Sequence, residues 1–359
     1  MTVESIAKSL SHSRLSTYIT PPIGCESHEA ALGIYVWNQK VCSAMSSVFH
    51  VIEIALRNSI YDGYCEFVQE SIVKGDTSKI PQAVLAEPKM WFKVAFDGYN
   101  TPGAPTKGAY MYRTCKDAER RLENEQKNLV PENYIAKLSL GFWVNFVDND
   151  GHFSDNGNAN IGGLYLWPHI RSKVFPNALK SKGRPLSINH IHTELSWFNQ
   201  LRNRLAHHEP LWKGKKQFDV KSIINKVVKD YQRCLTILGW INPAMTRLIE
   251  LGKTHEEIKM LTDLNYVKGM MALANDLDAR PAINLLEGIV EIDETLRGQL
   301  VKKVTPDFWL LRCDDNVEFF AAARQAPVHA QPGNRVSFLP NLPASPKKKP
   351  TATKLLILT

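Results

Sequence analysis

The longest regular pattern of apolar positions lies between His28 and Val68, where apolar residues recur at steps of three and four. That spacing places them along one face of an α-helix. Between Gly33 and Gly63 the run contains neither Pro nor Gly, the residues that most often interrupt a helix. The sequence therefore predicts one long helix against which the other elements pack.

Apolar periodicity, together with helix-start and helix-stop residues, predicts four more helices further along the chain. Ser187 is a suitable N-cap for the third of them, and Pro210 stops that helix near His208. Gly239 is a suitable end for the fourth. The predicted helices cover residues 112–129, 131–147, 187–208 and 218–238. Because strand signals are few and short, we expect an all-α helical bundle over residues 1–240.

The pattern changes after Asn242 and Pro243. Residues 241–325 are typical of several shorter helices, and the chain from 241 onward holds fifteen basic and fourteen acidic residues. Six prolines surround a Lys triplet in residues 326–359. Such a composition is typical of disorder. We therefore expect an appended C-terminal helical region, followed by a disordered tail rich in Pro and Lys.

Charge and cysteine usage narrow the class of protein. The 359 residues carry a formal net charge of +8, and residues 171–233 alone hold fourteen Lys and Arg against four Asp and Glu, a local net charge of +10. A concentrated basic surface is typical of nucleic-acid binding, although a solubilising surface has the same composition. The six scattered cysteines argue against a zinc ribbon and a disulfide scaffold. No apolar run reaches the length of a membrane span. These features predict a soluble protein of a reducing compartment, with no membrane partner.

One segment groups residues that could carry out chemistry. Residues 201–210 read LRNRLAHHEP and place Arg202, Asn203, His207 and His208 within about two turns of the third predicted helix. A His can move a proton near neutral pH, and an Arg offers a fork of donors that matches a phosphate. These groups suit cleavage of an RNA phosphodiester by the neighbouring 2′-hydroxyl, a reaction that requires neither metal nor cofactor. The alternative interpretation is structural, because basic residues are common at helix C-termini.

The segment resembles the motif of the HEPN superfamily, in which an Arg is followed after four to six residues by a His. Arg202 satisfies that spacing with His207 and with His208, and Asn203 stands where HEPN ribonucleases tend to have a polar residue. More narrowly, the chain is similar to the AbiD and AbiF type of the Abi family of bacterial abortive-infection proteins. The phrases that carry this similarity lie at Leu15–Ile19, Ala31–Val41, Val51–Ile60, Leu140–Phe146, Leu166–Ile170, Val174–Ala178 and Leu201–Trp212.

The resemblance covers about residues 10–240 and implies an all-α HEPN-type bundle, a homodimer and a location in the bacterial cytoplasm. It also implies a metal-independent endoribonuclease that acts as an antiphage toxin and is held silent by an antitoxin partner. In that scheme Arg202 and His207 are catalytic, and Asn203 and His208 support them.

A second Arg-Asn pair lies in the long predicted helix, at Arg57 and Asn58, shortly after Glu53. Glu53 and Arg57 have the spacing of a helical ion pair, which would anchor the bundle. In the functional alternative, this group lines the RNA-binding cleft and supports the catalytic residues. Further basic residues in and after the motif are expected to bind the RNA backbone, namely Arg204, Lys213, Lys215 and Lys216.

Two functions of different classes therefore follow from the sequence. One is the endoribonuclease. The other is a non-catalytic protein that holds a structured or regulatory RNA in the basic cleft.

Overall fold

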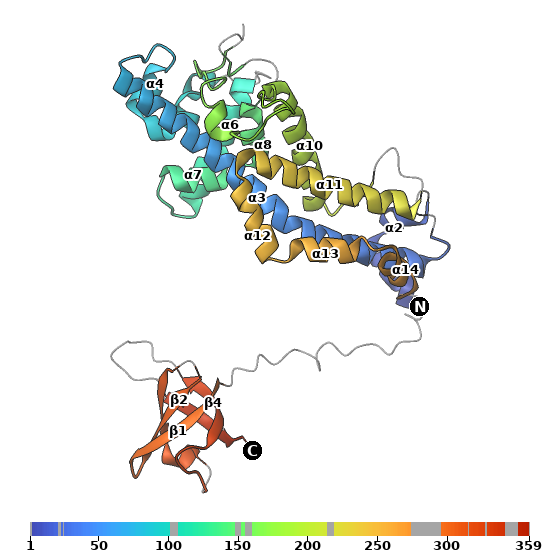
Figure 1. The fold of residues 1–359 in the computed structure, drawn as a ribbon, viewed down its shortest axis with the longest axis vertical. Helices are drawn as coiled ribbons and strands as arrows, with labels where there is room; N and C mark the ends of the chain where they lie inside the picture. The colour runs from blue at the N-terminus through green and yellow to red at the C-terminus, as the bar shows by residue number, and fades with distance from the viewer. Residues whose placement is uncertain are drawn as a thin grey trace. The chain divides into compact units, whose positions relative to one another are not determined.

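Two hydrophobic cores divide the computed structural model of the chain into two units, Met1–Arg280 and Pro281–Thr359. The first unit is helical and the second is built from β-strands (Figure 1). The structure describes residues 2–20, 23, 25–100, 107–147, 152–154, 160–213, 219–273, 296–314, 316–326, 329–341 and 351–358.

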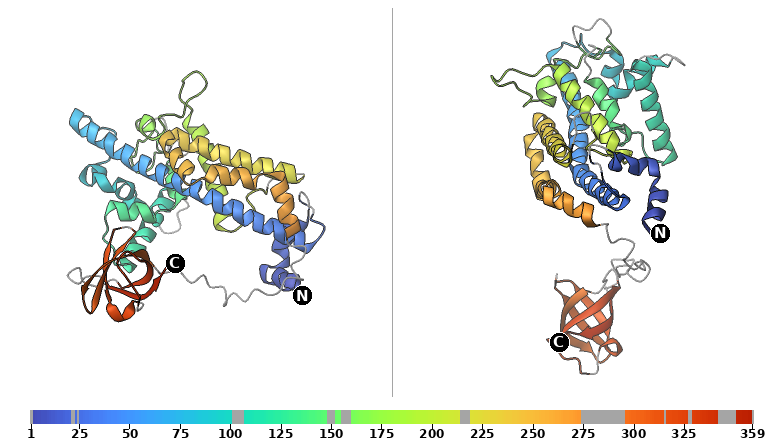
Figure 2. Two further views of the ribbon diagram at one scale, coloured as in Figure 1. Left: turned by 60° about the horizontal axis from the view of Figure 1, so that its bottom comes forward. Right: turned by 90° about the vertical axis from the view of Figure 1, so that its right-hand side faces the viewer.

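The helical unit is organised around α3 (His28–Lys74), the long blue helix in Figures 1 and 2. Its 47 residues correspond to about 70 Å of helix. The Ser27 side chain caps its start by accepting a hydrogen bond from the Ala30 backbone N–H at 3.1 Å. Gly75 ends it in a left-handed conformation with φ 73°. The predicted long helix is therefore present and continues beyond Val68.

Helices from both ends of the unit pack against α3, namely α2 (His12–Ile19), α11 (Val220–Ile241), α13 (Thr254–Leu261) and α14 (Leu264–Leu273). The backbone of α14 comes so close that a Cβ on Gly33 would lie 1.9 Å from the carbonyl oxygen of Met270. The buried Trp37 indole N–H donates to the Leu261 carbonyl at 2.8 Å. Residues 246–273 thus share the core of the helical unit, and the boundary predicted at residue 240 does not separate them from it.

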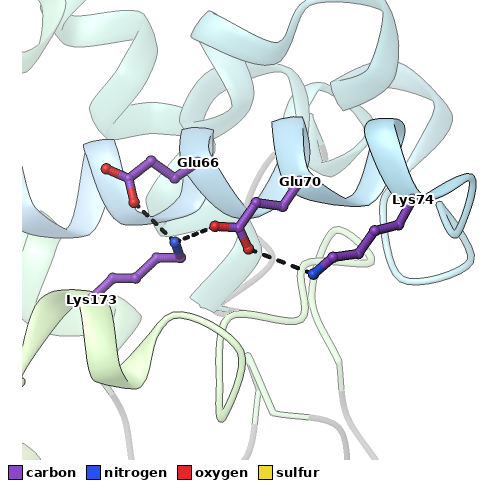
Figure 3. A network of polar contacts seen from close by, with 4 residues as sticks. All are labelled: Glu66, Glu70, Lys74 and Lys173. Carbon is purple, nitrogen blue, oxygen red and sulfur yellow. Dashed lines mark hydrogen bonds and ion pairs between the residues drawn. The ribbon is translucent and has the colours of Figure 1, made fainter.

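The later half of α3 packs against an aromatic cluster. The Trp91 ring lies 4.6 Å from the Tyr64 ring of α3, measured between centroids. At the end of the helix, the Lys173 Nζ lies 3.0 Å from Glu66 Oε2 and 2.6 Å from Glu70 Oε1. Figure 3 shows these two contacts. The aromatic cluster around Trp91 and Tyr64 also contains five other fully buried rings, those of Phe92, Phe96, Trp143, Phe146 and Phe153.

The remaining helices of this unit are mostly short. They are α1 (Thr2–Leu10), α4 (Gln82–Ala86), α5 (Trp91–Val94), α6 (Lys107–Asn124), α7 (Pro131–Lys137), α8 (Leu140–Phe146), α9 (Arg171–Val174), α10 (Ile188–Ala206) and α12 (Thr246–Leu251), with 3-10 turns at Pro88–Met90, Asp97–Tyr99 and Pro243–Met245. The single helix predicted from Pro131 is two helices, because the Ser139 side chain accepts from the Phe142 N–H and starts a new one. The helix predicted to end at Gly239 continues through it to Ile241.

The second unit is a closed β-barrel. Its strands are β1 (Leu296–Thr305), β2 (Phe308–Cys313), β3 (Glu318–Ala322), β4 (Arg335–Asn341) and β5 (Thr351–Ile357), in the order β1-β2-β3-β5-β4, and β4 pairs with β1 to close it. A fourth strand that returns to lie beside the first is the Greek-key arrangement. Of the described strand pairs of the barrel, β3–β5 is parallel and the other four are antiparallel. A 3-10 turn, η4 (Ala323–Gln325), follows β3.

The barrel has its own core, made of side chains that alternate along the strands. Trp309, Leu311 and Cys313 of β2 point inward and meet Phe319 and Ala321 of β3. The alternation on β1 is broken, because the register shifts between Leu300 and Lys302 and again between Lys303 and Thr305. Such irregularities are bulges, which bend a strand as barrel closure requires.

The expectation of an all-α protein with a helical extension is therefore wrong. In the described part of the region predicted as helical over residues 241–325, the α-helices lie between residues 246 and 273, and the strands β1, β2 and β3 follow. The predicted disordered tail over residues 326–359 contains β4 and β5. The six prolines around the Lys triplet suggested disorder, yet one of them, Pro340, lies within β4.

In the part of the chain that the structure describes, no helix combines the length and the apolar character needed to cross a membrane.

Candidate functional site

The motif lies at the C-terminal end of α10. The helix forms because Ser187 caps its start and because Leu195, Phe198 and Leu201 bury one face. It ends in a Schellman motif, in which the His208 N–H donates to the Leu205 carbonyl at 3.0 Å and the Glu209 N–H donates to the Arg204 carbonyl at 2.8 Å. The predicted start at Ser187 and the predicted stop near His208 both agree with the structure.

His208 occupies the position of this motif that glycine normally takes. Its φ is 55°, in the left-handed region that few non-glycine residues adopt. Backbone in this region costs on the order of 1 kcal/mol for a residue with a side chain and tends to occur at functional sites. The helix end therefore carries an imidazole at a position where a glycine would be more stable.

Three contacts hold this helix end in place. Arg14 Nη1 donates to the His208 carbonyl at 3.4 Å, and Arg204 Nη1 donates to the Lys213 carbonyl at 2.5 Å. Asn38, a buried residue of α3, accepts from the Leu211 N–H at 3.2 Å through its Oδ1. Arg204 was expected to bind RNA, but its guanidinium also fixes the chain that follows the motif.

Arg202 connects the motif helix to α3. Its Nε lies 3.4 Å from Glu53 Oε2, and the two side chains are 35% and 17% exposed. No described residue pairs with its two Nη groups. The carboxylate of Glu53 therefore orients the guanidinium from its edge and leaves the paired donors on the other side for a ligand.

Glu53 and Arg57 do not form the helical ion pair that their spacing suggested, because among the described residues the partner of Glu53 is Arg202. Arg57 is half-buried, and its Nε is enclosed without a hydrogen-bond partner in the described structure. Asn58 is exposed. Arg57 and Asn58 both follow Glu53 on α3, and it is Glu53 that pairs with Arg202 of α10.

The two histidines differ in their surroundings. Both are exposed, and His207 is the C-cap residue of α10. His208 and Leu205 line a hollow of about 360 Å³ against α3, whose other walls are Tyr35, Asn38, Gln39, Cys42, Ser43 and Ser46. Neither Arg202 nor His207 lines this hollow. Burial raises the pKa of the Cys42 thiol to about 11, so this thiol is not a nucleophile near neutral pH.

The other predicted residues are distributed as follows. Asn203 and Lys213 are exposed, and Lys215 and Lys216 lie outside the described residues. Arg14 and Asn38 were not predicted as parts of the site. Asn38 had a detectable signal, because it is a polar residue at an apolar-face position of the long helix. Arg14 had none, since its contact with the motif spans 194 positions of sequence.

The described residues contain no group of three or more His, Cys, Asp or Glu side chains that could hold a metal ion.

Comparison of the chain with protein-family models, with curated proteins and with solved structures finds no match in any of the three.

Proposed function

We propose that this protein is an endoribonuclease of the type that its motif resembles, and that it cleaves RNA by attack of a 2′-hydroxyl on the adjacent phosphate. The observation that carries the proposal is the state of Arg202. Glu53 holds its Nε, while both Nη groups are left without a partner among the described residues, and the His207 imidazole is exposed at the end of the same helix.

In this reaction the 2′-oxygen bonds to phosphorus and the bond from phosphorus to the 5′-oxygen breaks. His207 takes the proton of the 2′-hydroxyl and returns it to the departing 5′-oxygen. The Nη groups of Arg202 bind the non-bridging oxygens and stabilise the charge that gathers there. The products are a 2′,3′-cyclic phosphate and a free 5′-hydroxyl.

The remaining residues of the motif support these two. Asn203 is exposed one position after Arg202, where its amide can bind a phosphate oxygen. His208 brings a second imidazole to the helix end. Lys213 and the net charge of +10 over residues 171–233 supply attraction for the RNA backbone. We further propose that the active form is a homodimer, and that the activity serves as an antiphage toxin controlled by an antitoxin partner.

The test compares purified wild-type protein with Arg202→Ala and His207→Ala on a defined RNA in excess EDTA. Each variant is expected to cleave at least about 100-fold more slowly, because each removes a group that acts in the transition state. His190→Ala is the matched control, since His190 is an exposed histidine near the other end of α10. Undiminished cleavage by either variant, or loss of wild-type cleavage in EDTA, contradicts the proposal.

One observation favours the second candidate function, a non-catalytic RNA-binding protein. The hollow beside the motif is lined by His208 but by neither Arg202 nor His207. An RNA bound in this hollow would therefore not need to contact the two proposed catalytic residues. In that case the purified wild-type protein carries a specific RNA that stays intact. The endoribonuclease instead predicts that intact RNA accumulates only on the Arg202→Ala and His207→Ala variants.

A further inference from the structure

The barrel is more basic than the segment that precedes it in the sequence. Residues 296–359 hold ten Lys and Arg against four Asp and Glu, a net charge of +6. Residues 241–295 hold five basic and ten acidic residues, a net charge of −5. The near-zero charge from residue 241 onward therefore averages an acidic segment with a basic barrel, and the barrel suits an anionic partner.

The connectivity of the barrel gives one of its faces special interest. A five-stranded Greek-key barrel with the order β1-β2-β3-β5-β4 has the architecture of the OB-fold. Barrels of this kind bind ligands as different as oligonucleotides and oligosaccharides, on the face formed by strands 2 and 3. Because a fold alone does not determine which ligand is bound, the ligand class must be inferred from the side chains on that face.

The outward side chains of β2 and β3 follow from the register of the strands. Trp309 and Leu311 point into the core, so Phe308, Leu310 and Arg312 lie on the opposite face of the strand, where Phe308 and Arg312 are exposed and Leu310 is covered at 8% exposure. The register places each of them opposite an outward residue of β3, in the pairs Phe308–Ala322, Leu310–Phe320 and Arg312–Glu318. On the other side of β2, Lys302 of β1 pairs with Leu310.

Phe308 is the most unusual member of this face. Its side chain lies outside the core, and the residue is 46% exposed. Its cross-strand neighbours are the small residues Thr305 and Ala322, which leave room beside the ring. Phe320, half-buried, is a second aromatic residue on the same face. Exposed aromatic rings on a basic surface are the stacking platforms of single-stranded nucleic-acid binding.

Positive charge lies on either side of these rings. Lys302 is exposed and forms no ion pair with any described residue. From Phe308 to Arg312 the strand extends about 13 Å, and Arg312 borders a hollow of about 460 Å³ with a second guanidinium, that of Arg335. Both of these arginines have carboxylate partners, Glu318 and Asp314. Among the described residues of β1 and β2 on this face, Lys302 is therefore a cation that is available to a phosphate.

We infer that the outer face of β2 and β3 binds single-stranded RNA, with Phe308 stacking on a base and Lys302 contacting the backbone. The choice of RNA over DNA rests on the proposed endoribonuclease function. The stacking surface and its charge stand on the barrel alone. The two units then share one substrate, which the barrel binds and the helical unit cleaves.

The test uses the full-length protein and a 2′-O-methyl oligouridine dodecamer in which one nucleotide is 2′-O-methyl-4-thiouridine, so that no residue has a free 2′-hydroxyl beside a phosphodiester. This strand cannot be cleaved through a 2′-hydroxyl, so the binding result does not depend on the nuclease activity. Ultraviolet crosslinking followed by mass spectrometry is expected to place crosslinks on β2 and β3. Phe308→Ala is expected to reduce crosslinking there and the affinity for the strand about tenfold, whereas Phe308→Trp retains both.

Two matched controls separate stacking and charge from general effects. Leu356→Ala removes an exposed apolar residue from β5, away from this face, and is expected to bind as the wild type does. Lys302→Gln is expected to reduce the slope of log affinity against log salt by about 0.7, and Arg297→Gln, near the other end of β1, is not.

Crosslinks confined to the helical unit, or unchanged binding by Phe308→Ala, overturn the inference and assign this face to another class of partner, such as a peptide or an oligosaccharide. Neither result affects the nuclease proposal, which depends on Arg202 and His207. Conversely, cleavage that survives in those variants leaves the binding result for the barrel intact.

Discussion

The helical unit and the barrel both offer basic surfaces, but they differ in the kind of chemistry that their exposed side chains support. The end of α10 carries two exposed imidazoles and a guanidinium held by Glu53. The outward positions of β2 and β3 carry Phe308, Phe320, Arg312 and Glu318, with Leu310 largely covered at 8% exposure, and none of them is a histidine or a cysteine. One surface is suited to react with a phosphodiester and the other to bind a strand.

Their internal organisation also differs. The helical unit places its site between α3 and α10, so the motif depends on contacts between distant segments such as Arg14 with His208. The face of the barrel depends only on the register of neighbouring strands. We therefore expect substitutions near the motif to affect activity through geometry, and substitutions on the barrel face to act locally.

The largest expected effects come from core substitutions that test whether the two units unfold separately. Phe198 is fully buried and lies 5.4 Å from the Phe49 ring, so Phe198→Ala is expected to destabilise the helical unit by about 3–5 kcal/mol. Leu311→Ala is expected to destabilise the barrel by about 2–5 kcal/mol. Calorimetry with circular dichroism should show each substitution lowering a different transition. A single transition that moves in both variants contradicts the division into two units.

Glu53→Gln tests whether the carboxylate of α3 positions the Arg202 guanidinium, which we propose to be catalytic. Because it removes the partner of the Arg202 Nε, kcat for RNA cleavage is expected to fall about tenfold with little change in KM. Glu194→Gln is a matched control. Glu194 lies on α10, the helix that carries the motif, but it pairs with Arg233 of α11 at a distance from the motif. If both variants lose the same activity, the role of Glu53 is structural.

His208→Gly tests the cost of the left-handed backbone at the motif. Glycine adopts φ 55° without strain, so the free energy of unfolding is expected to rise by about 1 kcal/mol in urea titrations. His208→Ala keeps a Cβ and is expected to bring little of that gain. Equal stability of the two variants would show that the position is not strained.

The smallest expected effect concerns the network at the end of α3 in Figure 3. The hydrogen bond from Lys173 holds the pKa of Glu70 below its ordinary value. A carboxyl whose pKa is lowered by folding stabilises the folded protein at pH values above the ordinary pKa of the group. That stabilisation is lost as the pH falls through the pKa of the group in the folded protein. Lys173→Met should therefore raise the pKa of Glu70 in an NMR titration, and its stability deficit should vanish in acid. A Glu70 pKa that stays lowered in Lys173→Met assigns the shift to another cause.

The difference between the helical unit and the barrel also explains which elements could be predicted from the sequence. Helices such as α3 and α10 follow from apolar spacing over a few turns and from local caps such as Ser187. Both limits of α10 and the start of α3 were predicted closely, whereas α3 continues past the predicted end at Val68 to Lys74. The barrel depends on pairing between distant residues, for example Gly298 with Val336. Its bulges also disturb the period-two pattern of β1, which removes the usual signal of a strand.

For the candidate site, the residue types were predictable and their partners were not. The spacing of Arg202 and His207 identified the segment, and the structure places both at the surface. The ion pair of Glu53 with Arg202 joins two helices, so the spacing within α3 pointed instead to Arg57. The left-handed conformation of His208 has no signature in a single sequence, because glycine is the residue expected there.

The central claim is that Arg202 and His207 promote attack by a 2′-hydroxyl. The most direct measurement compares two RNAs in EDTA that differ only in a single 2′-deoxy residue at the cleaved position, with analysis of the product ends. We predict that the all-ribose strand yields a 2′,3′-cyclic phosphate and a 5′-hydroxyl, and that the 2′-deoxy strand stays intact at that position. Cleavage of the 2′-deoxy strand there, or products with a 5′-phosphate, would contradict the account.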